Sequence, residues 1–220
     1  MTNTAQKQLN KRIRITVLCI LIFITLVMTL FLNKMLSPRI MSPDELRVNG
    51  AIVFENPRVL PSVELIDHNN KEFTLESLKD QWTLIFYGFL HCPDICPTTL
   101  AELSRVYNDL DDDIKEKTQI ILVTADPARD NTEDLGKYVT YFNPSFLGLT
   151  GEFLNIKRFA NNLNVAFNKV TTDDGYTIDH TGNVMLINPL GHYHGFFKPP
   201  FKLAQMKGTY QSIVTTFNPN

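Results

Sequence analysis

Two cysteines separated by three residues are the side chains in this sequence best suited to chemistry. Cys92 and Cys96 lie in His91-Cys92-Pro93-Asp94-Ile95-Cys96-Pro97. An apolar run that predicts a buried strand precedes them, and a helical pattern follows from Pro97. The pair should therefore sit at a helix N-terminus, where unpaired N–H groups and the positive end of the dipole stabilise thiolates. A thiolate is both a nucleophile and a ligand for soft metal ions.

Three interpretations of this pair remain open from the residues alone. A permanent disulfide suits an oxidising compartment, but it would close a loop too short to restrict much chain entropy. A thiol–disulfide redox pair would use the same sulfurs, although thioredoxin-type pairs have two intervening residues rather than three. A metal site needs a third ligand from elsewhere, because two cysteines underfill it. We favour the metal site.

The best candidate for the third ligand is His180. It lies between a predicted turn at Asp173-Asp174-Gly175 and an apolar strand predicted for 184–188. In a thioredoxin-like layout this segment would pass beside the start of the helix that follows Cys96. Two thiolates and one imidazole suit cuprous or cupric copper, and zinc accepts the same set with one open position. Ligand chemistry alone therefore favours copper only modestly.

The rest of the sequence predicts one α/β domain that would position these residues. Strands that alternate with helices indicate parallel pairing with helices on the faces, and a late hairpin followed by a closing helix indicates a mixed sheet of the thioredoxin type. Ligands in such sheets lie beyond the carboxyl ends of the strands, where the cysteines are expected. We expect a hairpin at 63–75, strands at 82–89 and 119–124, helices at 97–110, 132–142 and 151–163, a hairpin at 184–197 and a closing helix at 201–217.

The N-terminal segment predicts a membrane anchor. Residues 15–32 carry no charge and would span ~27 Å as a helix, close to the ~30 Å hydrocarbon thickness. Basic residues precede this run and no acidic one does, so the positive-inside rule predicts a cytoplasmic tail at 1–14. A tether at 33–50 and an exported domain at 51–220 would follow. A cleaved signal peptide is the alternative, but the run exceeds a typical signal core and no good cleavage site follows it.

Composition and charge exclude several classes of protein. The 220 residues are 44% hydrophobic and 20% charged, which is ordinary for a globular chain. The net charge of −2 does not suggest binding to nucleic acid. Three cysteines are too few for a disulfide-rich scaffold or a four-cysteine metal site. No nucleophile–base set and no phosphate-binding loop is evident, so we expect a binding protein rather than an enzyme unless the cysteines exchange disulfides.

The chain also resembles a known family. Residues 88–98, Gly-Phe-Leu-His-Cys-Pro-Asp-Ile-Cys-Pro-Thr, look like the copper-binding motif of the Sco/SenC family. Residues 123–130 and 148–151 resemble two further landmarks of that family, and Asp179-His180-Thr181 is similar to its histidine-ligand motif. The resemblance runs in order from about Phe54 to the C-terminus.

The resemblance implies a thioredoxin-like fold and a role in assembling the binuclear copper centre of cytochrome c oxidase. It implies that Cys92, Cys96 and His180 bind copper. Leu90 and Thr181 stand where threonine and serine are frequent, but neither change removes a ligand. The expected protein is a copper metallochaperone anchored in the bacterial inner membrane, with its domain on the periplasmic or outer side.

The partners implied are the copper-containing subunit of the oxidase and, further, other copper chaperones or thiol reductants. The alternative function is a thiol–disulfide oxidoreductase that keeps the copper-ligand cysteines of the oxidase reduced. In that case Cys92 and Cys96 would act as the redox pair, and His180 would matter little to turnover.

Other polar residues near these motifs have weaker claims to function. Asp179 could orient the His180 ring, as carboxylates beside metal-bound histidines do. His192 and His194 share one strand face and could bind a metal together, although a polar hairpin edge is favoured. Loop contacts, caps or ion pairs are expected for His91, Asp94, Asp126, Arg129 and Asp130.

Overall fold

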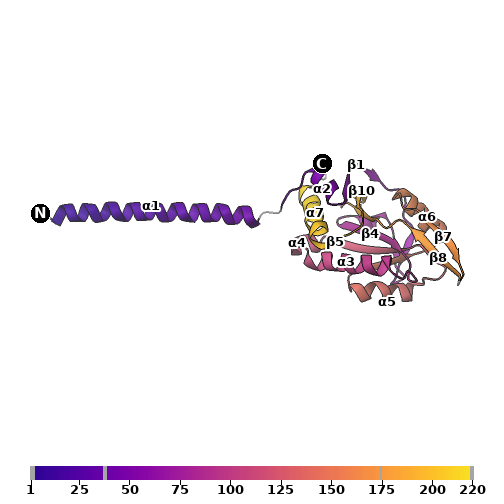
Figure 1. The fold of residues 1–220 in the computed structure, drawn as a ribbon. Coiled ribbons are helices and arrows are strands. Elements are labelled where there is room, and N and C mark those ends of the chain that lie inside the picture. Colours follow the sequence, from indigo (N-terminus) through magenta and orange to yellow (C-terminus); the bar gives the residue numbers. More distant parts are fainter. Residues whose placement is uncertain (1–2, 37–38, 174, 219–220) are drawn as a thin grey trace. The chain divides into compact units, whose positions relative to one another are not determined.

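The computed structural model describes residues 3–36, 39–173 and 175–218 and divides the chain into two units. The first unit is Met1–Arg39 and the second is Ile40–Asn220. Figure 1 shows that the first is one long helix and the second an α/β fold. Asp174 of the predicted turn and a few residues of the predicted tail, tether and C-terminus lie outside the described ranges.

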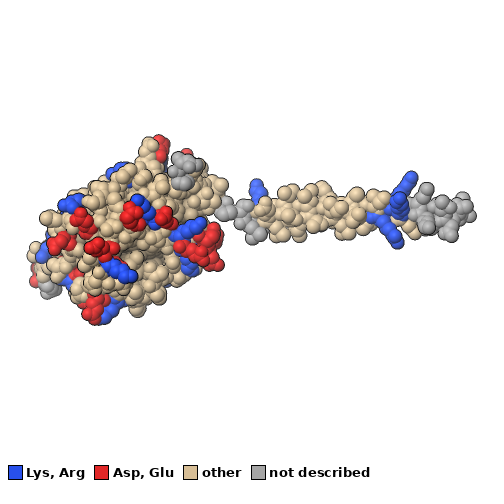
Figure 2. Space-filling model, turned by 180° about the vertical axis from the view of Figure 1, so that it is seen from behind, with Lys and Arg blue, Asp and Glu red and all other residues tan. Residues whose placement is uncertain are grey.

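Helix α1 spans Asn3–Leu36. Among the described helices it is the only one that is long and apolar enough to cross a membrane. The candidate span is Asn10–Lys34, with a mean hydropathy of 3.0, and it is longer than the predicted run at 15–32. Figure 2 shows basic side chains at both ends of its uncharged stretch. Within the helix, Thr16, Thr25 and Thr29 donate to carbonyls four residues earlier. Their hydroxyls are therefore satisfied without water.

The segment predicted as a tether contains a short helix and is hydrogen-bonded to the rest of the second unit. Helix α2 spans Pro43–Val48, and Ser42 and Glu45 close a capping box at its start. The backbone N–H of Met41 donates to the hydroxyl of Ser212, 2.7 Å away. The second unit therefore begins at Ile40, about ten residues before the predicted domain boundary.

An eight-stranded mixed sheet forms the centre of the second unit, in the order β1-β10-β9-β4-β5-β6-β2-β3. Strand β4 pairs in parallel with β5, and β5 with β6, while the other neighbours are antiparallel. Strand β4 is buried along its whole length and β5 nearly so, as their apolar runs predict. The bounds are β1 Ala51–Val59, β2 Leu65–Asp67, β3 Glu72–Phe73, β4 Trp82–Gly88, β5 Thr118–Thr124, β6 Leu147–Thr150, β9 Val184–Ile187 and β10 His192–Phe197.

Helices flank this sheet close to the predicted positions, and their buried sides complete the hydrophobic core. Helix α3 contacts both α5 and α7, and α5 also contacts β6. Helix α3 begins two residues before the predicted start at Pro97. The bounds are η1 Leu75–Leu78, α3 Ile95–Asp109, α4 Asp112–Lys115, α5 Thr132–Phe142, α6 Phe153–Asn162 and α7 Leu203–Thr216. The predicted mixed sheet flanked by helices is confirmed.

Strand β1 was not predicted from the sequence. It lies at an edge of the sheet and pairs with β10, with a register shift between Val53 and Arg58. Pro57 lies within the strand, and buried and exposed residues do not alternate regularly along it. Proline and an irregular pattern are both tolerated at a sheet edge, which is why this strand lacks a clear sequence signature.

Strands β7, Phe167–Thr172, and β8, Gly175–His180, form a separate two-stranded sheet. We call it the β7–β8 hairpin. Phe167 pairs with His180 at its base, and Thr172 pairs with Gly175 beside its turn. Only the turn of this hairpin was predicted. His180 therefore lies at the end of a ribbon that is not part of the large sheet.

Candidate metal centre

The two cysteines lie where strand β4 gives way to helix α3. Strand β4 ends at Gly88 and the helix begins at Ile95, so Cys96 is in the first helical turn and Cys92 is in the preceding loop. Cys96 is fully buried, whereas Cys92 is half-buried. The backbone N–H of Cys96 donates to the sulfur of Cys92 at 3.4 Å. This is the placement that the sequence predicts.

Gly88 allows the sulfur of Cys96 to pack against the end of β4. A Cβ at Gly88 would lie 2.8 Å from this sulfur and 3.0 Å from Cδ1 of Leu122. Sequence reasoning missed this residue, although a glycine inside an apolar strand is a signal of close approach by another group. The absence of a side chain at this position is therefore part of the site.

His180 reaches the cysteines from the β7–β8 hairpin. Its Nε2 lies 3.4 Å from the sulfur of Cys96. The ligand atoms of Cys92, Cys96 and His180 all lie within 4.8 Å of one another. In the described part of the chain, no other three or more Cys, His, Asp or Glu side chains meet in this way. The structure thus brings together the three residues that the sequence singled out.

The imidazole of His180 is held by its backbone neighbour and by two aromatic rings. Its Nδ1 lies 3.2 Å from the carbonyl oxygen of Thr181. The rings of Phe86 and Phe89 meet it edge-on, with centroids at 5.7 and 6.1 Å. Asp179 is exposed, so the carbonyl of Thr181, rather than that carboxylate, faces the ring nitrogen. A hydrogen bond from Nδ1–H to this carbonyl would leave Nε2 free to bind a metal.

Burial favours the neutral forms of Cys96 and His180 before any metal binds. It raises the pKa of Cys96 well above the usual range for a thiol, assisted by the hydrogen bond with Cys92. It also lowers the pKa of His180. The sequence predicted a stabilised thiolate at the helix start, whereas for Cys96 desolvation raises the pKa more than the backbone hydrogen bond with Phe89 lowers it. A metal ion must therefore displace the proton of Cys96.

Asp130, from the loop after β5, holds the loop that carries Cys92. Its Oδ2 accepts the backbone N–H of Leu90 at 3.1 Å and the hydroxyl of Thr124 at 2.6 Å. The Nδ1 of His91 lies 3.8 Å from its other oxygen. Asp130 is 1% exposed, and burial raises its pKa. His91 therefore faces a carboxylate in a loop contact, as predicted.

Asp94 and His194, two of the other sequence candidates, are not part of the ligand cluster and make structural contacts. Asp94 lies at the N-cap position of α3, and its Oδ1 accepts the hydroxyl of Thr98 at 3.3 Å. His194 is buried, with its ring centroid 5.2 Å from that of Trp82 and 5.5 Å from that of Phe217. The predicted polar edge is therefore wrong for His194, because strand β10 is covered on that side. Burial lowers the pKa of His194 to about 4.

Comparison with known proteins assigns the family. The SCO1/SenC family model matches residues 54–215, which include all three candidate ligands. The chain belongs to the SCO1/SenC family. The family resemblance that the sequence motifs indicate is thus confirmed, and its match begins close to the predicted start at Phe54.

Two relatives illustrate the similarity. A protein of Stutzerimonas stutzeri whose name describes it as copper-binding is 39% identical over 166 residues, which cover 75% of this chain and 81% of the relative. The mitochondrial protein SCO2 of Saccharomyces cerevisiae is 35% identical over 153 residues, which cover 68% of this chain and 49% of that protein. The chain therefore spans about half of the yeast relative.

Solved structures of the family share this fold. Yeast Sco1 with copper bound is 30% identical and superposes with a TM-score of 0.68, covering 74% of this chain and 92% of that one. ScoI of Bradyrhizobium japonicum with copper bound is 34% identical, with a TM-score of 0.63 and coverages of 69% and 96%. These matches confirm the predicted thioredoxin-like fold and the expected link of the family to copper.

Proposed function

We propose that this chain is a membrane-anchored copper metallochaperone that helps to assemble the binuclear copper centre of cytochrome c oxidase. One copper ion would be bound by Cys92, Cys96 and His180. The observation that carries the proposal is the convergence of these three ligand atoms within 4.8 Å. Two thiolates and an imidazole form a soft donor set that matches cuprous copper and also accepts cupric copper.

The uneven burial of the ligands suits a protein that receives and releases its metal. Cys96 is buried and Cys92 is half-buried, so one sulfur is open to incoming ligands from a partner. Copper would pass to the copper-containing subunit of the oxidase by stepwise ligand exchange, with the Cys92 bond broken early. Three protein ligands leave room in the coordination shell for such an exchange.

The topology proposed is a single pass through the bacterial inner membrane. The basic N-terminal tail would lie in the cytoplasm and the globular unit on the periplasmic or outer side. Support comes from the apolar span Asn10–Lys34 and from the basic residues that precede its uncharged part.

A titration of the reduced full-length protein with cuprous ion, in detergent and without oxygen, tests the copper site. We expect one copper per chain, weaker binding for His180→Ala, and no specific binding for the Cys92→Ala/Cys96→Ala double variant. Cys19→Ala is the matched control, because Cys19 is an exposed thiol on α1 and should not contribute. Undiminished binding by the double variant would exclude this site, and binding by His180→Ala equal to that of the wild type would exclude the histidine.

A thiol–disulfide oxidoreductase is the second candidate function, favoured by the half-exposed sulfur of Cys92 beside a buried thiol. The Cys92 thiolate would attack a disulfide of the oxidase subunit and displace one of its thiolates, leaving a mixed disulfide. Cys96 would then attack the Cys92 sulfur and release the second thiol. The partner gains two electrons, and Cys92 and Cys96 end as a disulfide.

The role of His180 separates the two functions. A reductase assay uses the disulfide-bonded copper subunit of the oxidase as substrate and compares wild type with His180→Ala. Full reductase activity in this variant, together with failed copper loading of the oxidase, would assign the exchange reaction to the cysteines alone. Loss of oxidase loading without any measurable reductase activity in either protein supports the metallochaperone.

A further inference from the structure

The position of His180 is not set by the large sheet. The β7–β8 hairpin forms its own two-stranded ladder, which no strand of the eight-stranded sheet joins in the described part of the chain. Strands β4 and β5, by contrast, position the cysteine loop through a continuous parallel ladder. The hairpin must therefore be held over the cysteines by side-chain contacts.

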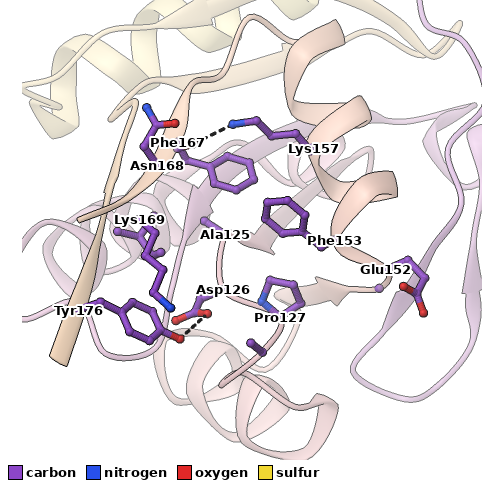
Figure 3. Close-up of a pocket in the computed structure, with 13 residues that line it drawn as sticks. Ala125, Asp126, Pro127, Glu152, Phe153, Lys157, Phe167, Asn168, Lys169 and Tyr176 are labelled. Atoms are coloured by element: carbon purple, nitrogen blue, oxygen red, sulfur yellow. Dashed lines mark hydrogen bonds between the residues drawn. The ribbon is translucent and has the colours of Figure 1, made fainter. Parts of the chain in front are cut away.

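One set of contacts holds the base of the hairpin. Phe167, which pairs with His180, stacks on Tyr87 with ring centroids 6.2 Å apart and meets Phe153 edge-on at 6.1 Å. The Nζ of Lys157 on α6 donates to the Phe167 carbonyl at 2.7 Å and lies 4.2 Å from the ring centroid. Figure 3 shows Phe153, Lys157 and Phe167 close together where the base of the hairpin faces helix α6. This anchor fixes strand β7.

A second set of contacts holds strand β8, four residues before His180. The Tyr176 hydroxyl donates to Oδ1 of Asp126 at 3.1 Å, as Figure 3 shows. Arg129 donates from Nη1 to the Tyr176 carbonyl at 3.2 Å, and its guanidinium carbon lies 3.7 Å from the Tyr176 ring centroid. Arg129 also pairs with Asp126. We call Asp126, Arg129 and Tyr176 the Tyr176 latch.

The latch is built from groups with little freedom to move. Asp126 is 4% exposed and the Arg129 side chain is 27% exposed, so their ion pair is largely withdrawn from water. Lys169 lies over the Tyr176 ring as well, with Nζ 3.4 Å from the centroid. Two cations therefore lie over the ring, and the hydroxyl donates a hydrogen bond to a buried carboxylate. This arrangement favours one orientation of β8.

The same short loop contacts both halves of the metal centre. Asp130 accepts the backbone N–H of Leu90 in the cysteine loop, and its neighbour Arg129 contacts Tyr176 in the hairpin. We propose that Asp126 and Arg129 are positioning residues that hold the β7–β8 hairpin through Tyr176 and so keep His180 within binding distance of the two sulfurs. This inference rests on the proposed role of His180 as a copper ligand.

Tyr176→Ala is the variant that tests the latch, because it leaves the buried pair of Asp126 and Arg129 intact. Tyr176→Phe keeps the ring and its contacts with the two cations and loses only the hydroxyl, so it should hold the hairpin nearly as well as the wild type does. Val170→Ala is the control within the hairpin, since Val170 is an exposed residue of β7. All variants are made in the full-length chain and studied in detergent.

Two measurements are made on each variant. Copper titration should show a loss of affinity of about tenfold for Tyr176→Ala, the lower end of the range for residues that support a metal ligand. The cupric form should also lose the nitrogen hyperfine signal of an imidazole in its electron paramagnetic resonance spectrum. In the metal-free protein, hydrogen exchange of the amides of β8 should accelerate, whereas Tyr176→Phe and Val170→Ala should stay close to the wild type.

A double-mutant cycle shows whether the latch acts through His180. In a His180→Ala background, Tyr176→Ala should cause no further loss of copper affinity. The inference is overturned if Tyr176→Ala binds copper as the wild type does, or if its loss persists unchanged in the His180→Ala background. If His180→Ala alone binds copper normally, the proposed ligand role fails. Unchanged amide exchange in Tyr176→Ala would separately show that the latch does not hold the hairpin.

Discussion

The sulfur of Cys96 lies against Gly88 at the end of strand β4. The sulfur of Cys96 fills the room that a side chain at position 88 would take, and Leu122 closes the other side. Because protein interiors are close-packed, an added methyl group at position 88 would force the neighbouring atoms to shift. The chemistry of a single residue here depends on the missing side chain of another.

Gly88→Ala should therefore weaken copper binding without removing a ligand. Its Cβ would lie 2.8 Å from the Cys96 sulfur, so the sulfur must shift, and we expect at least about a tenfold loss of copper affinity. Overpacking should also lower the free energy of unfolding by about 1–3 kcal/mol. Gly182→Ala is the matched control near His180, because its Cβ would meet only Pro199 Cγ at an ordinary 3.7 Å. Equal copper affinities in the two variants would contradict this account.

At the scale of elements, the large sheet and the small hairpin contribute differently to the site. Strands β4 and β5 are buried and joined by a regular parallel ladder, which makes the cysteine loop a rigid extension of the core. The β7–β8 hairpin is held by side chains, so it is the softer half of the centre. Strand β1 lies at the far end of the sheet order from β5 and β6 and adds stability rather than ligands.

Gly195→Ala should separate the stability of the sheet edge from metal binding. A Cβ at Gly195 would lie 2.2 Å from the carbonyl oxygen of Ile52 in β1, and backbone atoms cannot yield as a flexible side chain does. We expect the free energy of unfolding to fall by about 3 kcal/mol or more, which is the range for severe overpacking. Protein that remains folded should still bind one copper.

Urea unfolding of the metal-free chain in detergent measures this loss, with Gly208→Ala on α7 as the control. At Gly208 the nearest atom to a new Cβ is the flexible Cε of Met41, at 3.2 Å. The gain in helix propensity, up to about 1 kcal/mol, should offset that contact. Similar unfolding midpoints for Gly195→Ala and the wild type would show that the close approach of β1 and β10 is not a constraint.

For the whole molecule, the globular unit combines a candidate metal centre at one end of its strands with buried polar groups elsewhere in its core. His194 lies between Trp82 and Phe217, and its nearest polar partner is the side-chain amide of Asn188, 3.4 Å away. Protonation of this imidazole would place a charge among aromatic rings. The stability of the unit is therefore linked to pH.

His194 should destabilise the folded unit in mild acid. Its pKa falls from 6.5 to about 4 on folding, so the unfolded chain binds the proton more readily. Stability is then complete above pH 6.5 and declines as the pH falls toward 4, by up to about 3 kcal/mol. His180, whose pKa burial also lowers, acts in the same sense. Between pH 7 and pH 5 the wild type should lose about 2 kcal/mol.

Urea unfolding of the wild type and of His194→Gln at pH 7 and pH 5 measures this contribution. The variant keeps a polar side chain but cannot titrate, so its stability should change less between the two pH values. A loss in the variant as large as that in the wild type would assign the acid sensitivity to other groups, such as the paired carboxylates.

The amino-acid order by itself determined the local features of this protein. An uncharged run predicted the apolar helix, and apolar stretches predicted β4 and β5. The position of Cys92 and Cys96 between an apolar run and a helical pattern placed the pair where a strand turns into a helix. These inferences succeed because strand burial, helix periodicity and helix capping depend on residues close together in the chain. The capping box of Ser42 and Glu45 is equally local, although helix α2 was not predicted from it.

Tertiary structure decided everything that depends on distant residues. The sulfur of Cys96 meets the imidazole of His180 across 84 positions in the chain, because the β7–β8 hairpin folds back over the cysteine loop. Burial, which raises the pKa of Cys96, arises only when the sheet and its helices pack together. The motifs therefore named the candidate ligands, while packing determined the distances between them and the contacts that hold them.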